Sequence, residues 1–502
     1  MSSTVIDTRP TPGVPRPYAF PAFERARLAN GLTLVTAHLP GRPLVSAVLL
    51  MINGAADEPP EWAGATILAA RALSEGTERY DAIQLVEAAE RLGAGLHAEA
   101  SWDVTSAGVD VPGARLGAAL ELLAELVHRP TFPASEVERL RDERLNDLLQ
   151  ARADPRRRAE EAFTETIYTA ASPYHRPGGG TPETVARLDR DVLRTAYERG
   201  RDPARATFLV AGDLSGLDVP GVVSRLFGDW QPSPHAGAVS AIRADGAVES
   251  RFVRLVHRPG SVQTEVRIGH VGLPRRIDDY PAVAVTGAIL GGLFNSRLNM
   301  KLREEKGYTY GASAGWELRR AAGPFAARAA VNGDATIPAI QDFLTELDRI
   351  RDERVTDAEL KAARDYLVGV FPIRFETPSA VLGALAGLAV HGLPDEELTQ
   401  YRERIEAVTA DDVLATAQRR IRPDRFAIVL VGDADKIGDG LAGAAFGPVR
   451  VERDEGPMAR GPEESVEEQI GPLDTDQQEI VLAVDDNPLD EREQEPDDAG
   501  PA

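Results

Sequence analysis

An internal duplication constrains this chain more strongly than any other feature of its sequence. Two segments, Arg205-Ala-Thr-Phe-Leu-Val-Ala-Gly-Asp213 and Arg425-Phe-Ala-Ile-Val-Leu-Val-Gly-Asp433, place an arginine, an apolar run and Gly-Asp at equal spacing. Each follows a similar helix-like segment, Asp191-Val-Leu-Arg-Thr-Ala or Asp412-Val-Leu-Ala-Thr-Ala. The offset of about 220 residues is too long for a solenoid repeat. The chain is therefore predicted to contain two copies of one domain.

The duplication and the segments around it predict the domain boundaries. Homologous domains are expected at residues 25–230 and 251–452, joined by a linker at 231–250 whose start is rich in proline and small residues. A proline-studded arm (1–24) and an acidic tail (453–502) are expected to be disordered. The tail has too few apolar residues to offset the entropy lost on ordering.

Strand-like and helix-like patterns are mixed within each half. In the first half, the strands come first, at residues 32–37 and 45–52, and are bounded by glycine and proline. Helices are predicted at residues 64–73, 81–92, 114–127 and 135–151. One helix carries an apolar stripe at steps of four, three and four residues, which predicts core packing: Leu116, Leu120, Leu123 and Val127. This order predicts an α+β fold, with two α/β-sandwich halves in which helices cover a sheet.

Composition excludes several classes of function. The chain has no cysteine, so it forms no disulfide and has neither a thiolate metal site nor a cysteine nucleophile. The net charge is −23, and residues 454–502 account for −15 of it. Neither these residues nor the rest of the chain offers the basic face that binding of nucleic acid requires. No apolar run approaches the ~18–20 residues of a membrane span, and residues 1–20 do not resemble a signal peptide. We expect a cytoplasmic protein without a membrane partner, and its excess of arginine over lysine suggests a bacterial genome of high GC content.

The histidines are too far apart for a helical zinc motif. The chain has eight, and no two lie closer than 13 residues, whereas such motifs need histidines three or four positions apart. The triple glycine Gly178-Gly-Gly180 lacks the lysine of a phosphate-binding loop and is interpreted as a turn. The chain is therefore predicted to hold no zinc.

One segment combines a helix, a sharp bend and two polar side chains that could take part in catalysis. Ser296 is a plausible helix N-cap and Gly307 a plausible C′ residue, so about ten helical residues fit between them. The alternation after Gly307 predicts a strand that carries Tyr310, whereas Arg303 falls in the last helical turn. Such a cation and phenol could hold a carbonyl oxygen as it becomes an oxyanion. Helix capping by Arg303 and packing by Tyr310 is the simpler alternative.

Over residues 25–452 the sequence resembles the insulinase/pitrilysin (inverzincin) family of metallopeptidases. The first half contains the motifs Asn30-Gly-Leu-Thr, Gly54-Ala-Ala-Asp-Glu58, Gly64 to Glu75-Gly-Thr77, Gly93-Ala-Gly-Leu-His-Ala98 and Gly180-Thr-Pro-Glu183. The second half contains Leu302-Arg-Glu-Glu-Lys-Gly-Tyr-Thr-Tyr-Gly311. Each match is weak alone, but together they occur in the family's order over both halves.

The chain departs from the family at the catalytic signature. The family's His-x-x-Glu-His precedes Gly-Thr, and counting back from Gly76-Thr77 places Ile67, Ala70 and Arg71 at those positions. The third metal ligand, a glutamate in the family, should fall near residues 147–150, where only Asp147 is acidic. His97 stands where the family has an asparagine beside the substrate strand. The resemblance therefore implies that the metal site is lost.

The resemblance implies a division of labour between two chains. In two-subunit members of the family one chain binds zinc, and the other lacks metal and supplies an arginine and a tyrosine seven residues apart, which Arg303 and Tyr310 match. The chain is thus expected to be the inactive subunit of a heterodimeric metalloendopeptidase, with zinc and His-x-x-Glu-His in the partner and a peptide as substrate. A purely structural protein of the same fold, or a peptide-binding scaffold without a peptidase role, are the alternatives. The sequence identifies neither the peptide nor the partner.

Overall fold

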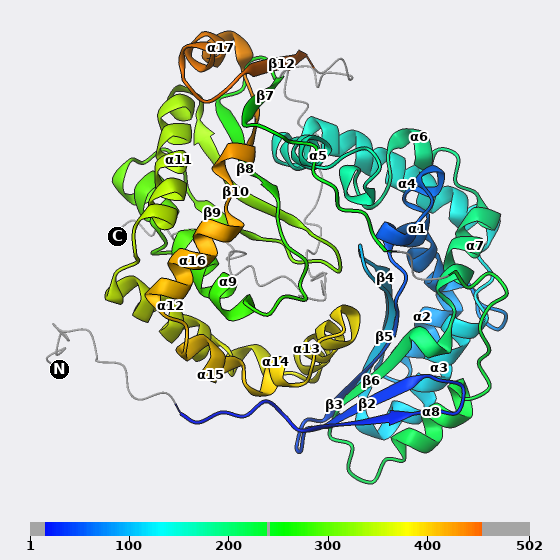
Figure 1. Ribbon diagram of the computed structural model, residues 1–502. Helices are drawn as coiled ribbons and strands as arrows, with labels where there is room; N and C mark the ends of the chain where they lie inside the picture. Colours follow the sequence, from blue (N-terminus) through cyan, green and yellow to red (C-terminus); the bar gives the residue numbers. More distant parts are fainter. Residues whose placement is uncertain (1–15, 238–240, 454–502) are drawn as a thin grey trace, which may run out of the picture.

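Two six-stranded sheets that match in five of their strands form the framework (Figure 1). The computed structural model describes residues 16–237 and 241–453. In the first sheet the strand order is β1-β2-β6-β3-β5-β4, and in the second it is β12-β7-β11-β8-β10-β9. The first comprises β1 (Phe23–Arg27), β2 (Thr33–His38), β3 (Leu44–Met51), β4 (Gly95–Ala100), β5 (Thr105–Pro112) and β6 (Ala206–Gly212). The second comprises β7 (Phe252–His257), β8 (Gln263–Val271), β9 (Ala312–Trp316), β10 (Pro324–Asn332), β11 (Ala427–Gly432) and β12 (Val449–Arg453).

The duplicated sequence segments occupy equivalent strands, which confirms the predicted fold of two similar halves. β6 and β11 each run parallel to one neighbour, β2 or β7, and antiparallel to the other, β3 or β8. Both strands are buried over most or all of their length, as their apolar runs require. β4 and β9 lie at equivalent edges of the two sheets.

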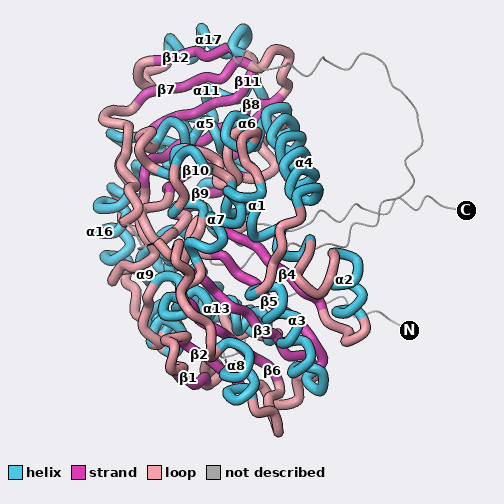
Figure 2. The backbone as a smooth tube through the Cα atoms, turned by 90° about the vertical axis from the view of Figure 1, so that its right-hand side faces the viewer, coloured by secondary structure: helices cyan, strands magenta, loops and turns pink. Residues whose placement is uncertain are grey.

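Helices of each half cover one face of its own sheet (Figures 1 and 2). The first half contains α1 (Ala65–Ala72), α2 (Ala82–Glu90), α3 (Leu116–His128), α4 (Ala134–Ala153), α5 (Pro155–Ile167), α6 (Pro182–Val185), α7 (Arg190–Gly200) and α8 (Val219–Phe227). The second contains α9 (Tyr280–Gly287), α10 (Arg297–Asn299), α11 (Thr336–Asp352), α12 (Asp357–Val370), α13 (Pro378–His391), α14 (Glu396–Thr399), α15 (Tyr401–Glu406), α16 (Ala410–Arg420) and α17 (Ala434–Gly443). The apolar stripe of α3 is buried throughout, as predicted.

The two halves exchange one helix each. α5 of the first half packs against β8 and β11 of the second sheet, whereas α13 of the second half packs against β3 and β6 of the first. The two helices are equivalent in the duplication, and each begins with a side-chain cap, Asp154 or Thr377, followed by proline at the first helical position. Each sheet is therefore covered on its second face by a helix from the other half.

Ion pairs add to this apolar packing across the halves. Arg267 on β8 is 3% exposed and donates from Nε to Oε1 of Glu160 on α5 at 2.6 Å. Arg320, after β9, binds Asp57 at 2.6 Å and Asp103 at 3.2 Å, both in the first half. The three side chains of the Arg320 pairs are at most 13% exposed, and breaking a buried pair of this kind leaves an uncompensated charge and costs about 3–5 kcal/mol. The two halves are therefore firmly joined.

Packed residues occur before the predicted boundary at residue 24. Phe20 is buried in the apolar core, and its ring lies edge-on to Phe375 at 5.0 Å. Tyr18 packs edge-on to Phe371 in the same way. Packing of these aromatic rings thus holds residues 18–20 against the core, although the prolines of this segment predicted a disordered arm. The tail beyond Arg453 lies outside the described residues.

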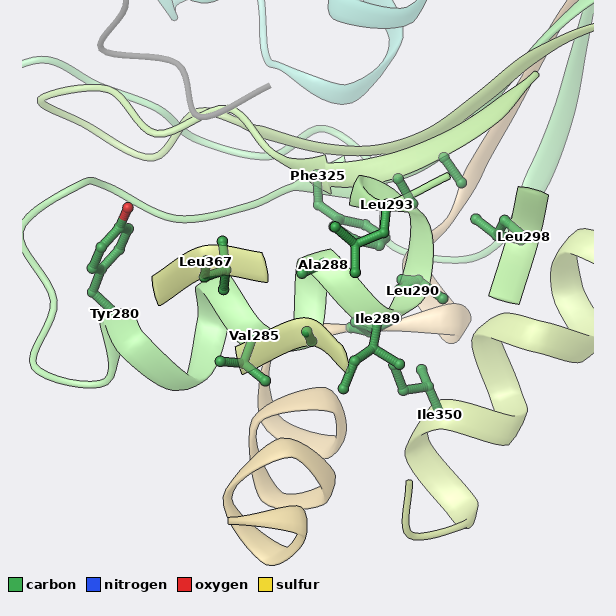
Figure 3. Close-up of a cluster of buried hydrophobic side chains, with 14 of the residues drawn as sticks. Tyr280, Val285, Ala288, Ile289, Leu290, Leu293, Leu298, Phe325, Ile350 and Leu367 are labelled. Atoms are coloured by element: carbon green, nitrogen blue, oxygen red, sulfur yellow. The ribbon is translucent and has the colours of Figure 1, made fainter. Parts of the chain in front are cut away.

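The apolar core of the second half supports the segment singled out in the sequence. Figure 3 shows Leu290, Leu293 and Leu298 gathered with Phe325 of β10. Leu290 and Leu298 are fully buried. This packing anchors the chain on which Arg303 lies.

Within the described residues no single helix is long and apolar enough to cross a bilayer, although one pair bent by 116°, residues 357–375 with 378–391, meets the same criteria.

Three buried histidines predict that acid destabilises the fold. Burial lowers the pKa of His128, His270 and His391 from 6.5 to about 4. The unfolded chain therefore binds more protons than the folded one between these values, and stability falls as the pH drops from about 6.5 to about 4. Each histidine should lower the free energy of unfolding by about 2 kcal/mol between pH 7 and pH 5. Urea unfolding at pH 7 and pH 5 measures this change in stability. The control is the exposed His235→Gln, which should leave the stability difference between the two pH values unchanged. Equal stability at pH 7 and pH 5 would contradict the prediction.

Candidate functional site

The helix at the family's metal position is fixed at its N-terminus by a buried carboxylate. Glu58 accepts hydrogen bonds from the backbone N–H groups of Gly64 at 3.0 Å and Thr66 at 2.5 Å, at the start of α1. Arg176 donates to the same carboxylate at 3.1 Å, and burial nevertheless raises the pKa of Glu58. Gly64 has φ +97°, and a Cβ there would lie 2.7 Å from the carbonyl oxygen of Gly179. The family-like Gly54–Glu58 motif and the glycine turn at 178–180 thus both hold α1 in place.

The three replaced catalytic positions on α1 offer no metal ligand. Ile67 is half-buried, and Ala70 is fully buried against the core. Arg71 is exposed and donates from Nη2 to Oε2 of Glu143 on α4 at 3.2 Å. Two of the three side chains are apolar and the third is a permanent cation, which repels a metal ion.

Asp147, the residue nearest to the family's third ligand, is bound by arginines. Arg157 donates to both of its oxygens, at 2.9 and 3.2 Å, and Arg144 binds it as well. The hydrogen bonds from Arg157, followed by the charges of Arg144 and Arg157, lower the pKa of Asp147. Its carboxylate is thus ionised but already satisfied. The residues present do not fit a zinc ion.

Ion pairs occupy this surface between α1, α4 and α5. Arg139 on α4 binds Glu75 at 2.9 Å and Glu136 at 2.7 Å, and also contacts Glu143 at 2.5 Å. We call the whole set the arginine–carboxylate network: Arg71, Arg139, Arg144 and Arg157 with Glu75, Glu136, Glu143 and Asp147. Where the family has a metal site, this chain has paired charges.

One group of three potential metal ligands occurs among the described residues: His257, Asp433 and Asp435. The backbone N–H of Ala434 donates to Nδ1 of His257 at 3.0 Å, so a neutral ring carries its proton on Nε2 and has no free lone pair. The first half repeats the arrangement, with Leu214 N–H donating to Nδ1 of His38 beside Asp213. Because it recurs at the equivalent strand ends, the group is better explained as a structural cap than as a metal site.

His97 lies on the edge strand β4 directly opposite Gly108 of β5. A Cβ at Gly108 would meet Nε2 of His97 at 2.3 Å, so the ring lies over the glycine. Burial lowers the pKa of His97, while the charge of Asp110 partly opposes this. A neutral imidazole on an edge strand can both donate and accept a hydrogen bond. Its role beside a peptide remains a prediction.

Arg303 lies in a helical turn wider than the sequence predicted. Instead of one α-helix between Ser296 and Gly307, a short α10 continues as a π-helical turn, Met300–Glu305. The Arg303 guanidinium lies 4.9 Å from the centre of the Phe294 ring and 3.4 Å from Glu304. Gly307 ends the turn in the left-handed region, with φ +64°. The predicted helix end is thus correct, whereas its regular α geometry is wrong.

Tyr310 is not on a strand, which corrects the sequence prediction. β9 begins only at Ala312, because Thr309 turns the chain first: its hydroxyl accepts from Gly311 N–H at 3.1 Å and donates to Gly311 O at 2.9 Å. Tyr308 is anchored, since its carbonyl accepts from Asn332 N–H at 3.0 Å. Tyr310 is 84% exposed.

The structure does not join Arg303 and Tyr310 by a side-chain contact. Within residues 16–237 and 241–453, neither a hydrogen bond nor a ring contact links them. Arg303 is 41% exposed, so both side chains are accessible from solvent on the segment around Gly307. They can therefore act together only on a third group that reaches both.

Sequence reasoning missed a polar cluster between the halves. It brings together Trp102 and Asp103 of the first half with Arg319, Arg320 and His391 of the second. Residues more than 200 positions apart meet there, and no local pattern marks them.

Comparisons with known proteins match both halves. The family model described as insulinase (peptidase family M16) matches residues 33–177, and the model described as peptidase M16 inactive domain matches residues 187–367. An uncharacterized zinc protease of Streptomyces coelicolor is 26% identical over 78% of this chain and 86% of its own length. One of Mycobacterium tuberculosis is 25% identical over 83% and 94%, and a non-peptidase homolog of Helicobacter pylori is 22% identical over 74% and 86%.

Solved structures agree in fold. A peptidase M16 inactive domain from Pseudomonas fluorescens superposes with a TM-score of 0.75 and 23% identity, covering 82% of this chain and 98% of the other. A protease from Helicobacter pylori gives 0.75 and 20%, covering 83% and 100%. With two family models matched in order over two equivalent halves, this chain belongs to the insulinase family, peptidase family M16.

Proposed function

We propose that this chain is the zinc-less subunit of a heterodimeric zinc metallopeptidase and supplies Arg303 and Tyr310 in trans. The observation that carries the proposal is a contrast between two sites of one chain. The family's ligand and base positions hold Ile67, Ala70 and Arg71. The arginine and tyrosine of the metal-free subunit are kept as Arg303 and Tyr310, and Tyr310 is exposed. A large aromatic side chain that is 84% exposed contributes little to its own core. Its retention is better explained by contact with another molecule.

The chemistry assigned to the pair is stabilisation of negative charge on a peptide carbonyl. Tyr310 can donate one hydrogen bond, and Arg303 adds a permanent charge and further donors. The zinc would belong to the partner, which resembles this chain and carries His-x-x-Glu-His. The peptide would lie between the two subunits.

Purified alone, the chain is expected to contain no stoichiometric zinc and to cleave no peptide. The reason is that Arg71 and the arginines around Asp147 leave no ligand set. Elemental analysis after dialysis measures the metal, and a fluorogenic peptide library measures cleavage. About one zinc per chain, retained after dialysis, would contradict the proposal.

Assembly is tested by co-expression with a homologous chain that carries His-x-x-Glu-His. The expected result is a one-to-one complex by size-exclusion chromatography, with zinc and peptidase activity present only in the complex. The purely structural or peptide-binding scaffold is the other function for this fold. The scaffold function is favoured if the two chains do not associate at micromolar concentration, or if the zinc-bearing partner is fully active by itself.

A further inference from the structure

β9 forms one edge of the second sheet, and part of its backbone points away from the sheet. Just after β9, Glu317 N–H donates to Pro324 O of β10 at 2.9 Å, next to the register pair of Trp316 and Phe325. The bonding direction alternates along an antiparallel strand, so Ala314 and Trp316 direct their N–H and C=O groups outward. In the part of the chain that the structure describes, no further strand lies beyond β9. The strand therefore offers an open edge.

A cavity of about 170 Å³ borders this edge. Residues on both faces of β9 line it, with Trp316 on one face and Ser313 on the other. The remaining wall comes mainly from α9, the π-helical turn Ala288–Gly292 and α12. Much of this wall is apolar and includes three residues that Figure 3 labels: Tyr280, Leu293 and Leu367. A cavity of ~150 Å³ accepts an apolar group the size of benzene.

The lining of this cavity has more positive than negative charge. Its three arginines are Arg275, Arg328 and Arg374. Its one carboxylate, Glu317, is already bound by Arg319 Nε at 2.7 Å. Arg328 is 33% exposed, and its ion pair with Glu160 is long, at 3.7 Å. An apolar segment with acidic neighbours therefore complements the cavity.

The corresponding edge of the first sheet, β4, has the opposite charge. The cavity beside it is lined by three carboxylates, those of Glu99, Asp103 and Glu317. Its one arginine, Arg319, is the partner of Glu317. An acidic segment is therefore repelled at β4 and attracted at β9.

The tail of this chain contains a segment of matching chemistry. Ile480-Val-Leu-Ala-Val484 is the longest apolar run of residues 454–502 and lies outside the described residues. Glu479 precedes it and Asp485-Asp486 follow it. Three of its five residues are β-branched, a composition that favours an extended strand.

The linker before this segment has a length that suits the distance to β9. β12 and β9 are opposite edges of one six-stranded sheet, so strand spacings of ~4.8 Å place them about 24 Å apart. The chain leaves the sheet at the end of β12, where Arg254 binds Glu452 at 2.7 Å. Residues 454–479 are 26 residues, and an unstructured linker of that length spans roughly 28 Å on average. The effective concentration of a tethered segment is highest when these two lengths match.

We propose that residues 480–484 dock on β9 of the same chain as an added strand and fill the cavity with apolar side chains. The segment pairs with the outward backbone groups of Ala314 and Trp316, and its acidic neighbours lie beside the arginines of the cavity. Docking also covers an edge that would otherwise be open to pairing with a second molecule. The proposal goes beyond the peptidase role and does not depend on a zinc-bearing partner.

Hydrogen exchange on the full chain, read by mass spectrometry, tests the docking. The amides of Ala314 and Trp316 should exchange at least tenfold more slowly in wild type than in Leu482→Pro, because proline removes a donor from the added strand. Ser465→Pro, in the same tail but outside the segment, should exchange as wild type. Equal exchange in wild type and Leu482→Pro overturns the proposal. Protection found only in a dimer assigns β9 to the tail of a second copy and also overturns it.

A labelled peptide with the sequence of residues 477–486 tests the site separately, by fluorescence anisotropy. It should bind the Leu482→Pro chain about tenfold more tightly than wild type, whose own segment competes at high effective concentration. No binding to Leu482→Pro at millimolar concentration, or equal binding to both chains, contradicts the proposal.

A variant that fills the cavity locates the peptide. Gly287→Leu, made in the Leu482→Pro chain, should weaken peptide binding at least tenfold. A Cβ at Gly287 comes no closer than 3.8 Å to Trp316, so the backbone accommodates the change. Gly117→Leu, on α3 of the first half, adds the same side chain to a helical glycine with open space and should leave binding unchanged. Circular dichroism checks that both variants fold, and unchanged binding to folded Gly287→Leu overturns the assignment to this cavity.

Discussion

Replacing Tyr310 by phenylalanine is expected to lower kcat of the complex with a zinc-bearing partner about 10²–10³-fold. The change removes one hydroxyl that would donate to the developing oxyanion, and loss of one such donor typically costs this much. Because the side chain is 84% exposed, the substitution should not disturb the fold. Steady-state cleavage of a fluorogenic peptide measures kcat and KM, and an effect confined to kcat indicates a role in the transition state.

Arg303→Ala is expected to act in the same direction and to raise KM as well, since a cation can also hold the ground-state peptide. Arg303→Lys keeps the charge but loses the planar donor set, so it should restore only part of the activity. Arg303 contacts Glu304 and the Phe294 ring, both on its own segment, so the replacements leave the core intact.

Tyr308→Phe is the matched control, because it removes the same hydroxyl two residues away. Tyr308 is fixed through backbone hydrogen bonds to Leu302 and Asn332, which the substitution retains. Assembly and zinc content of every complex should stay at the wild-type level. If Tyr310→Phe cleaves at the wild-type rate, donation in trans is wrong and the scaffold function is favoured.

Expressed separately, the two halves are expected not to fold. A fragment of residues 1–240 would lack α13, which packs on β3 and β6, and a fragment of residues 241–502 would lack α5. The apolar residues that α5 buries against the second sheet include Phe163 and Ile167, and α13 contributes Leu382 and Leu385 to the first. Fully burying such a side chain contributes about 1.5–3 kcal/mol, so several lost together exceed the usual stability of a domain.

Co-expression of the same two fragments should restore a folded complex. Circular dichroism and size-exclusion chromatography distinguish the outcomes, and a protease site placed at residues 238–240 of the intact chain is the control. After cleavage there, the halves should elute together. Folded, monomeric fragments would show that the exchanged helices are dispensable.

The sequence revealed what is repeated or local, and missed what depends on tertiary contacts. The duplicated motifs predicted β6 and β11 correctly, because each strand is a nearly continuous run of apolar residues in the sequence. The duplication could not show that α5 covers the second sheet and α13 the first, since the sequence of a helix does not specify which sheet it packs against. The strand predicted around Tyr310 failed because alternation of residues 308–314 is also compatible with a turn, which the Thr309 hydroxyl stabilises. The polar cluster around Asp103 and Arg320 joins segments that are distant in the sequence, so no local pattern predicts it.

The arginine–carboxylate network has a consequence for evolution. Arg71→His alone would remove the ion pair with Glu143 while Ile67 and Ala70 still provide no further ligand or base. Freeing Asp147 would require that both Arg144 and Arg157 change, because either arginine alone still binds its carboxylate. No single substitution toward His-x-x-Glu-His therefore creates a set of metal ligands. A metal site of the family's kind would need several of these substitutions at once, because the charges that now occupy its place satisfy one another.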